Sequence, residues 1–336
     1  MALVEATGHI ELALRYKTAT LSWQWQADWI DENLVSRSDS LETLCFPGLD
    51  TTPSSLGVRN IRPAASKWDF LGVGAGQPVW IFSDSSYTSA GFASTQSELT
   101  GNVNISLDSV IGPAGGVFSM YTGPTPTIYM QTINGISTTD VFPKPMAHTH
   151  VNWAFSQKGL WIVKLKAQGT LSSSGAATTT SATVPLVFAV GDYARWKAAR
   201  FSLNELSNSS ISGDDADPDQ DGWNNLMEYA LGGNCRVTSA LRESDGQPLA
   251  PILLPPTTPD APWGFSFFRR KAASGFEYTC AVEASSSLAA QTWSTETGSQ
   301  QIITSNTNWE RVSIPVSPPQ ANGMARFFRL KLSPIP

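Results

Sequence analysis

The fold class is decided by a stretch near the middle of the chain, which reads Gly159-Leu160-Trp161-Ile162-Val163-Lys164-Leu165-Lys166-Ala167. Polar and apolar residues alternate along it, as in a strand with one polar and one buried face. Similar short runs recur on both sides, and clusters of Gly, Pro, Ser and Asn separate them. These runs lie at 9–16, 77–82, 103–107 and 184–190. The pattern predicts that residues 1–192 form a β-sandwich domain.

The character of the sequence changes after residue 192. Residues 193–201 contain good helix formers with apolar residues three and four positions apart, and residues 224–231 form a second helical pattern that ends at Gly232-Gly233. We therefore expect residues 193–235 to form a helical linker. A Pro-rich connector follows, and β alternation returns from Pro262. Residues 236–336 are expected to form a second, smaller β-sandwich, so the expected fold is mainly β.

Composition excludes several classes of protein. The 336 residues carry 22 Lys and Arg against 28 Asp and Glu, so 22 − 28 gives a net charge of −6. No positive excess is available to hold a nucleic-acid backbone, and nucleic acid is not an expected partner. No run of about 18 apolar residues occurs, so we do not expect a membrane-spanning segment. The hydrophobic share of 41% with 12 Trp excludes wholesale disorder.

The start of the chain and the cysteines leave the compartment open. Met1 leads directly into an apparent strand, without the features of a signal peptide. Either the protein is cytosolic or Met1 replaces a signal peptide that has been removed. Cys235 and Cys280 could pair and leave Cys45 over, or all three thiols could be free.

An acidic loop inside the expected linker matches the calcium-binding pattern D-x-[DN]-x-[DN]-G-x5-E over residues 217–228. A solvated loop that caps a helix explains one or two acids, but not three at alternate positions followed by Gly and Glu. Gly222 permits the sharp turn that such loops need. The expected calcium ligands are the side chains of Asp217, Asp219, Asp221, Asn225 (directly or through water) and Glu228, and the carbonyl oxygen of Trp223.

This loop lacks a long entering helix and a second partner loop, unlike a paired EF-hand. It resembles the calcium loops of dockerins and thrombospondin type 3 repeats, which are extracellular modules. The resemblance implies that the protein is exported and that calcium has a structural role in the linker.

The three histidines suggest a second metal site. His9 and Glu11 share the polar face of the first strand, and His148 and His150 share the polar face of a later one with Asn152. If the two strands are neighbours, three imidazoles and one carboxylate could hold Zn²⁺ or a related transition metal. The alternative is that these are ordinary surface histidines.

Several motifs in residues 3–191 resemble the choice-of-anchor M domain, first described in actinobacteria. In chain order they are Gly8-His9-Ile10-Glu11-Leu12, Phe70-Leu71-Gly72 with Pro78-Val79-Trp80, Gly112-Pro113, and His148-Thr149-His150-Val151-Asn152-Trp153-Ala154-Phe155 with Gly159. The resemblance implies an exported, cell-surface bacterial protein; some members are encoded beside metal-type ABC transporters, and no enzymatic activity is established for the family. Many members carry a histidine pair in the second strand, where this chain has Ser22 and Gln24, and this departure weakens a carried-over metal site. The segment Tyr193 to Gly233 and the β domain after it are similar to C-terminal halves of exported proteins from verrucomicrobia-like bacteria.

Three functions follow from these features. We expect an exported or cell-surface, non-catalytic binding or structural protein that is stabilised by calcium, with a carbohydrate or another surface protein as its ligand. The alternatives are a transition-metal-binding protein and a metalloenzyme, both using the histidine cluster. The chain lacks the C-x-x-C, H-E-x-x-H and G-x-S-x-G signatures, so familiar redox, metalloprotease and hydrolase chemistry is not indicated.

Overall fold

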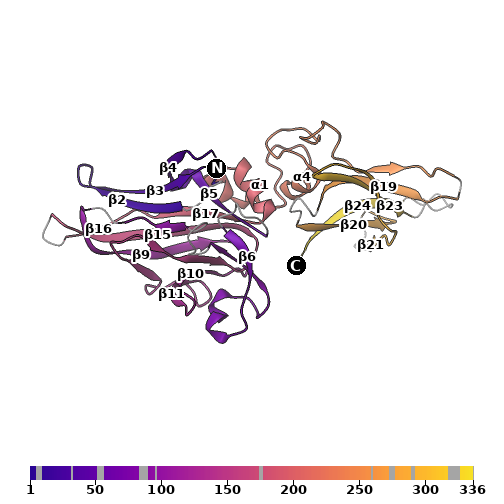
Figure 1. The fold of residues 1–336 in the computed structure, drawn as a ribbon. Helices are drawn as coiled ribbons and strands as arrows, with labels where there is room; N and C mark the ends of the chain where they lie inside the picture. The colour runs from indigo at the N-terminus through magenta and orange to yellow at the C-terminus, as the bar shows by residue number, and fades with distance from the viewer. Residues whose placement is uncertain are drawn as a thin grey trace. The chain divides into compact units, whose positions relative to one another are not determined.

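The computed structural model describes residues 1–4, 10–31, 33–50, 57–82, 90–94, 97–173, 177–258, 260–271, 277–288, 292–316 and 326–335. The chain divides into two compact units, Met1–Ser207 and Asn208–Pro336 (Figure 1). The expected mainly β fold is confirmed. The boundary between the units falls inside the segment 193–235, so the first part of the expected linker belongs to one unit and the acidic loop to the other.

The first unit contains a twelve-stranded sheet. Its strands are β1 (Ala2–Leu3), β5 (Leu44–Leu49), β6 (Gly57–Ile61), β7 (Pro78–Phe82), β9 (Leu99–Ile111), β10 (Phe118–Thr122), β11 (Thr127–Gln131), β12 (Val141–Lys144), β14 (Asn152–Phe155), β15 (Gly159–Leu171), β16 (Thr178–Thr180) and β17 (Val184–Val190). They follow the order β11-β10-β14-β7-β6-β5-β17-β15-β9-β12, with β1 beside β5 and β16 beside β15. Strand β15, which contains the decisive stretch, is antiparallel to both β9 and β17.

A five-stranded sheet forms the second layer of this unit. Its strands are β2 (Ile10–Lys17), β3 (Ser22–Ile30), β4 (Ser36–Ser40), β8 (Ala90–Phe92) and β13 (Thr149–His150), in the order β13-β8-β2-β3-β4. The apolar residues Ile10, Leu12, Leu14 and Tyr16 of β2 are buried in one hydrophobic core with Phe46 and Phe188 of the larger sheet. Because both sheets contribute their apolar faces to this core, the unit is a sandwich.

Short helices complete the first unit. They are the 3₁₀ helices η1 (Leu41–Thr43) and η2 (Ser66–Leu71) and the α-helices α1 (Asp192–Arg200) and α2 (Leu203–Leu206). Helix α1 buries Tyr193 and Trp196 and contacts β17. The N-terminal ammonium of Met1 donates to the carbonyl oxygens of Ala198 (2.9 Å) and Phe201 (3.2 Å). These contacts make α1 part of the first unit.

The second unit pairs two smaller sheets with helices α3 (Ser209–Ser212) and α4 (Asn225–Leu231). One sheet has the order β18-β19-β23-β22, and the other has the order β21-β20-β24. The strands are β18 (Ile252–Leu254), β19 (Trp263–Arg270), β20 (Tyr278–Ser285), β21 (Ser294–Thr295), β22 (Gln301–Ser305), β23 (Trp309–Val316) and β24 (Phe327–Pro334). The rings of Phe265 on β19 and Phe328 on β24 lie 6.1 Å apart and link the two sheets.

Candidate functional site

The acidic loop of the second unit brings three carboxylates together. One carboxylate oxygen from each of Asp217, Asp219 and Asp221 lies within 4.8 Å of the other two. Across the described part of the chain, no other group of three or more His, Cys, Asp or Glu side chains converges this closely. Like charges this close repel one another, and a cation held among them would reduce this repulsion.

Hydrogen bonds from the backbone shape this loop. Asp217 accepts from the amides of Gln220 (Oδ1, 2.8 Å) and Gly222 (Oδ2, 2.9 Å), and Asp221 Oδ1 accepts from the amide of Trp223 at 2.8 Å. The backbone φ angle of Gly222 is +95°, a conformation that glycine adopts without a steric penalty. The loop therefore closes on itself and directs the alternate aspartates to one side.

Three side-chain oxygens near this loop are buried and have no hydrogen-bond partner: Oδ2 of Asp219, Oδ2 of Asp221 and Oδ1 of Asn225. Asn225 is fully buried, and its Nδ2 donates to the carbonyl oxygens of Ile211 (2.9 Å) and Gly213 (2.7 Å). A buried polar atom without a partner costs about 1–3 kcal/mol. Burial and the neighbouring charge of Asp221 also raise the pKa of Asp219. A cation would compensate for each of these costs.

Helix α4 carries the remaining expected side-chain ligand. The side chain of Asn224 caps the helix by accepting from the amide of Met227 at 2.9 Å. Glu228 lies in the first turn and is fully buried, but its carboxylate does not belong to the group of three converging aspartates. Beyond the helix, the hydroxyl of Thr238 donates to the carbonyl oxygen of Asp219 at 2.7 Å.

The structure describes three of the four residues expected in the histidine cluster, Glu11, His148 and His150. His9 lies outside the described residues. Strand β8 pairs with both β2 and β13, and Gly91 is the register partner of Glu11 on one side and of His150 on the other. His148 Nε2 lies 3.4 Å from Glu11 Oε1, and the rings of His148 and His150 are 4.6 Å apart.

Other predicted members of this face lie elsewhere. The chain passes from the small sheet to the large one between His150 and Asn152, because β13 and β14 belong to different sheets. Asn152 is buried in β14, next to the core residues Val151 and Trp153. Gln24 is the register partner of Arg15, whereas Glu11 is paired with Asp28, so Ser22 and Gln24 lie toward the other end of β2.

Lys144 is a buried residue near the histidines that the sequence did not reveal. Its Nζ donates to the carbonyl oxygens of Pro145 (2.7 Å) and Ala147 (3.3 Å), in the turn that leads to His148. Burial lowers the pKa of Lys144 to about 8. The sequence signal was a single lysine between two prolines in the otherwise apolar stretch 141–147, and lysines are rarely buried.

The three cysteines, Cys45, Cys235 and Cys280, are buried, and no disulfide bond joins them. Burial raises the pKa of Cys45 to about 12 and that of Cys280 to about 11, although Arg269 partly opposes the shift at Cys280.

Comparisons with models of known protein families, with curated proteins and with solved structures found no match. Within the described ranges, none of the helices has the length and apolar character needed to cross a membrane.

Proposed function

We propose that this chain is an exported or cell-surface module without catalytic activity, whose second unit is stabilised by a calcium ion. The observation that supports calcium is the convergence of Asp217, Asp219 and Asp221 beside buried oxygens that have no hydrogen-bond partner. Calcium prefers six to eight oxygen ligands, including carboxylates, amide oxygens and backbone carbonyls. The ligand set of this proposal adds the carbonyl oxygen of Trp223 and the side chains of Asn225 and Glu228.

The proposed role of the ion is structural. Residues around the loop contact distant segments of the same unit, because Asn225 binds the backbone at Ile211 and Gly213, and Thr238 binds the backbone of Asp219. An ion at the loop would join these segments and relieve the repulsion among the carboxylates. Extracellular calcium modules bind with Kd values on the order of 10⁻⁴–10⁻³ M, which suits a site of this kind outside the cell.

Export and surface attachment rest on the resemblances of the two halves of the sequence, to choice-of-anchor M domains and to exported verrucomicrobial proteins. In this proposal the partner is a surface ligand, either a carbohydrate or another surface protein.

The calcium proposal is tested by thermal unfolding of the full chain with calcium and with a chelator. A ligand that binds only the folded state adds about 2.7 kcal/mol to the free energy of unfolding at a hundredfold excess over Kd. We expect calcium to raise the Tm, Asp219→Ala to remove this response, and Asp215→Ala, an exposed acid outside the proposed ligands, to keep it. An unchanged Tm of the wild type on chelation would contradict the proposal.

Transition-metal binding is the second candidate function, and the contact of Glu11 with His148 beside His150 favours it. Carboxylate and imidazole ligands suit Zn²⁺. An imidazole nitrogen must be unprotonated to bind the ion. We expect zinc retained after dialysis to fall below about pH 6.5 and to vanish in the double variant His148→Ala, His150→Ala, while the response of Tm to calcium persists. If the wild type retains no zinc at neutral pH, this second candidate function is wrong and the histidines are ordinary surface residues.

A further inference from the structure

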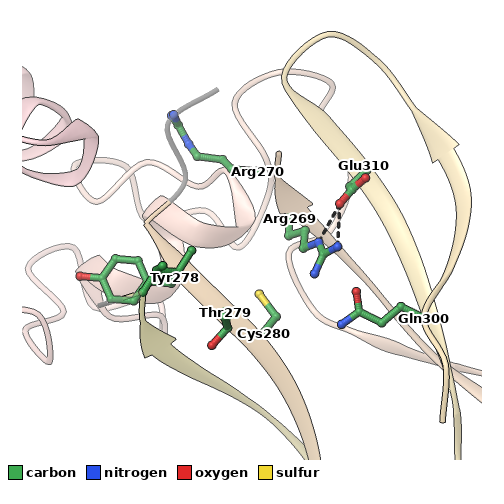
Figure 2. Close-up of a pocket in the computed structure, with 8 residues that line it drawn as sticks. Arg269, Arg270, Tyr278, Thr279, Cys280, Gln300 and Glu310 are labelled. Carbon is green, nitrogen blue, oxygen red and sulfur yellow. Dashed lines mark hydrogen bonds and ion pairs between the residues drawn. The ribbon is translucent and has the colours of Figure 1, made fainter. Parts of the chain in front are cut away.

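A cavity of about 250 Å³ lies in the second unit, between the two sheets (Figure 2). Its lining comes from β19, β20 and β23 and from residues beside β22 and β24. The base is formed by buried or half-buried side chains, while Thr279, Gln300 and Ile335 are exposed. The lining residues are Arg269, Arg270, Tyr278, Thr279, Cys280, Gln300, Glu310 and Ile335. The cavity therefore opens to solvent at one side.

An ion pair lies where the sandwich core would otherwise continue. Phe265 and Phe267 of β19 are buried, and Arg269 continues the same face of the strand. Glu310 is its register partner on β23, and the two side chains are 21% and 10% exposed. Apolar residues often replace a buried ion pair without loss of stability. A purely structural role at the end of the sandwich therefore does not account for the charges of Arg269 and Glu310.

The geometry of this ion pair leaves part of the guanidinium for another group. Arg269 donates through Nε (2.8 Å) and Nη2 (2.7 Å) to the same oxygen, Oε1 of Glu310. Figure 2 shows the remaining nitrogen directed away from Glu310, toward the side of Cys280. The amide end of Gln300 faces the same space. The ion pair thus fixes the orientation of the guanidinium. The N–H groups of its remaining nitrogen can donate hydrogen bonds into the cavity.

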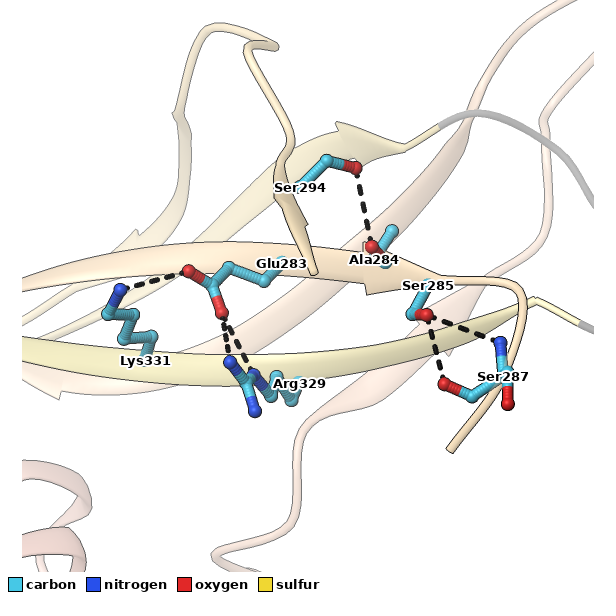
Figure 3. A network of polar contacts seen from close by, with 7 residues as sticks. All are labelled: Glu283, Ala284, Ser285, Ser287, Ser294, Arg329 and Lys331. Carbon is cyan, nitrogen blue, oxygen red and sulfur yellow. Dashed lines mark hydrogen bonds and ion pairs between the residues drawn. The ribbon is translucent and has the colours of Figure 1, made fainter. Parts of the chain in front are cut away.

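A second ion cluster in this unit has a different arrangement. Glu283 accepts at Oε2 from Arg329 (2.9 and 2.6 Å) and at Oε1 from Lys331 (3.1 Å), so both carboxylate oxygens are occupied (Figure 3). These contacts join β20 to β24 without lining the cavity. The cluster is a structural tie, in contrast to the Arg269 pair.

Arg269 is the cation that faces the cavity beside Cys280. Arg269 and Arg270 are consecutive residues of β19, so their side chains leave opposite faces of the strand. The guanidinium of Arg270 lies over the rings of Tyr229 (4.8 Å) and Trp309 (5.0 Å). Tyr278 and Cys280 stay neutral near pH 7 because burial raises the pKa of both groups. Together with Ile335 they supply apolar contact area.

We propose that this cavity binds a small organic carboxylate, with the carboxylate group at Arg269 and Gln300 and the apolar part against Tyr278 and Cys280. Taking about 30 Å³ per water-sized group, the volume admits about eight non-hydrogen atoms. This site is separate from the calcium loop and does not depend on the function proposed above.

Cys280 provides a direct test because it is the cysteine that lines the cavity, whereas Cys45 and Cys235 are completely buried. Iodoacetate and iodoacetamide have nearly the same size and differ in charge. With either reagent the thiolate forms a bond to the methylene carbon and iodide leaves. Both reagents consume the same thiolate, so the ratio of their rates at Cys280 does not depend on its pKa.

The experiment measures this ratio by mass spectrometry of the Cys280 peptide, in the folded full chain and in the urea-unfolded chain. We expect folding to raise the iodoacetate to iodoacetamide ratio about tenfold, as one charge-assisted hydrogen bond would. Arg269→Gln should return the ratio to the unfolded value. Arg311→Gln should not, because Arg311 lies on the opposite face of β23 with its Nε bonded to Ser266 Oγ at 2.9 Å.

Internal controls keep the result interpretable. If Arg269→Gln also exposes Cys235 to alkylation, the second unit of the variant has unfolded. A protection experiment on the wild type then replaces the variant: propionate should slow the reaction of iodoacetamide with Cys280, and propionamide should not. Equal ratios in folded and unfolded chains, or no protection by propionate, would overturn the proposal. A Cys280 that neither reagent reaches in the folded chain would overturn it as well.

Discussion

At the scale of single residues, Asp219 shows how the acidic loop stores unfavourable energy. Its Oδ2 is buried without a hydrogen-bond partner, while its Oδ1 accepts only a long bond, 3.4 Å, from the amide of Asp221. Burial, followed by the charge of Asp221, raises the pKa of Asp219. A carboxyl group whose pKa is raised by folding binds protons more tightly in the folded chain, so its ionised form destabilises the fold.

This raised pKa predicts opposite effects of acid with and without calcium. In calcium-free protein, lowering the pH from about 7 to about 4, near the ordinary carboxyl pKa, should stabilise the wild type relative to Asp219→Asn, because the folded state binds a proton more readily than the unfolded state does. In saturating calcium the same change should destabilise it, because protons compete with the ion. Urea unfolding midpoints of both proteins at the two pH values measure this difference. A shift of the same sign in both conditions would contradict a cation site at Asp219.

At the scale of elements, helix α4 depends on its surroundings. Its seven residues are too few for a stable isolated helix, so caps and packing must hold it. Asn224 caps its start, and Gly232 ends it in the left-handed conformation at φ +92°. A Cβ at Gly232 would lie 2.9 Å from the Trp309 ring, so close packing also requires glycine there. The helix carries both Asn225 and Glu228 of the proposed calcium site.

Removing the cap should therefore affect stability and calcium together. Asn224→Ala leaves the Met227 amide without its acceptor and should lower the free energy of unfolding by about 1 kcal/mol. It should also weaken calcium binding, because the first turn presents two of the proposed ligands. Asn224→Asp keeps an acceptor at the same place and should preserve both properties. Urea unfolding and calcium titration of the wild type and the two variants provide the comparison. A calcium affinity unchanged by Asn224→Ala would mean that calcium binding does not depend on the start of helix α4.

At the scale of the whole molecule, the large hydrophobic core and the acidic loop lie in different units. The first unit is a large sandwich whose core contains most of the buried aromatic residues. The acidic loop lies entirely in the second unit, beyond the boundary after Ser207. The energetic effect of an ion at the loop should therefore remain within residues 208–336.

Hydrogen exchange measured by mass spectrometry tests this confinement in the intact chain. Chelation should speed exchange in peptides that cover residues 208–238, including α4, and leave peptides of β15 and β17 unchanged. Local opening explains such a pattern, since exchange follows the stability of each cooperative segment. Faster exchange in β15 upon chelation would mean that the ion stabilises both units together.

Local features of the molecule were accessible from sequence because they depend on near neighbours. Strand β17 has the bounds that alternation predicted, 184–190, and the helices expected at 193–201 and 224–231 extend over Asp192–Arg200 and Asn225–Leu231. The convergence of the three aspartates likewise follows from a turn within one short loop. The boundary between the units lies after Ser207, inside the linker expected at 193–235. Helix α1 packs on the first unit through buried aromatic residues, and helix periodicity does not specify such contacts.

The sequence by itself determined the mainly β fold and the spacing of the carboxylates in the loop, because alternation and turn chemistry act over a few residues. Only the tertiary structure decided that Glu11 meets His148 across strand β8, while Asn152 enters another sheet. It also decided that Arg269, Glu310 and Cys280 share one cavity. Such contacts join strands far apart in the chain, and their pairing depends on the packing of whole sheets, which no local pattern contains.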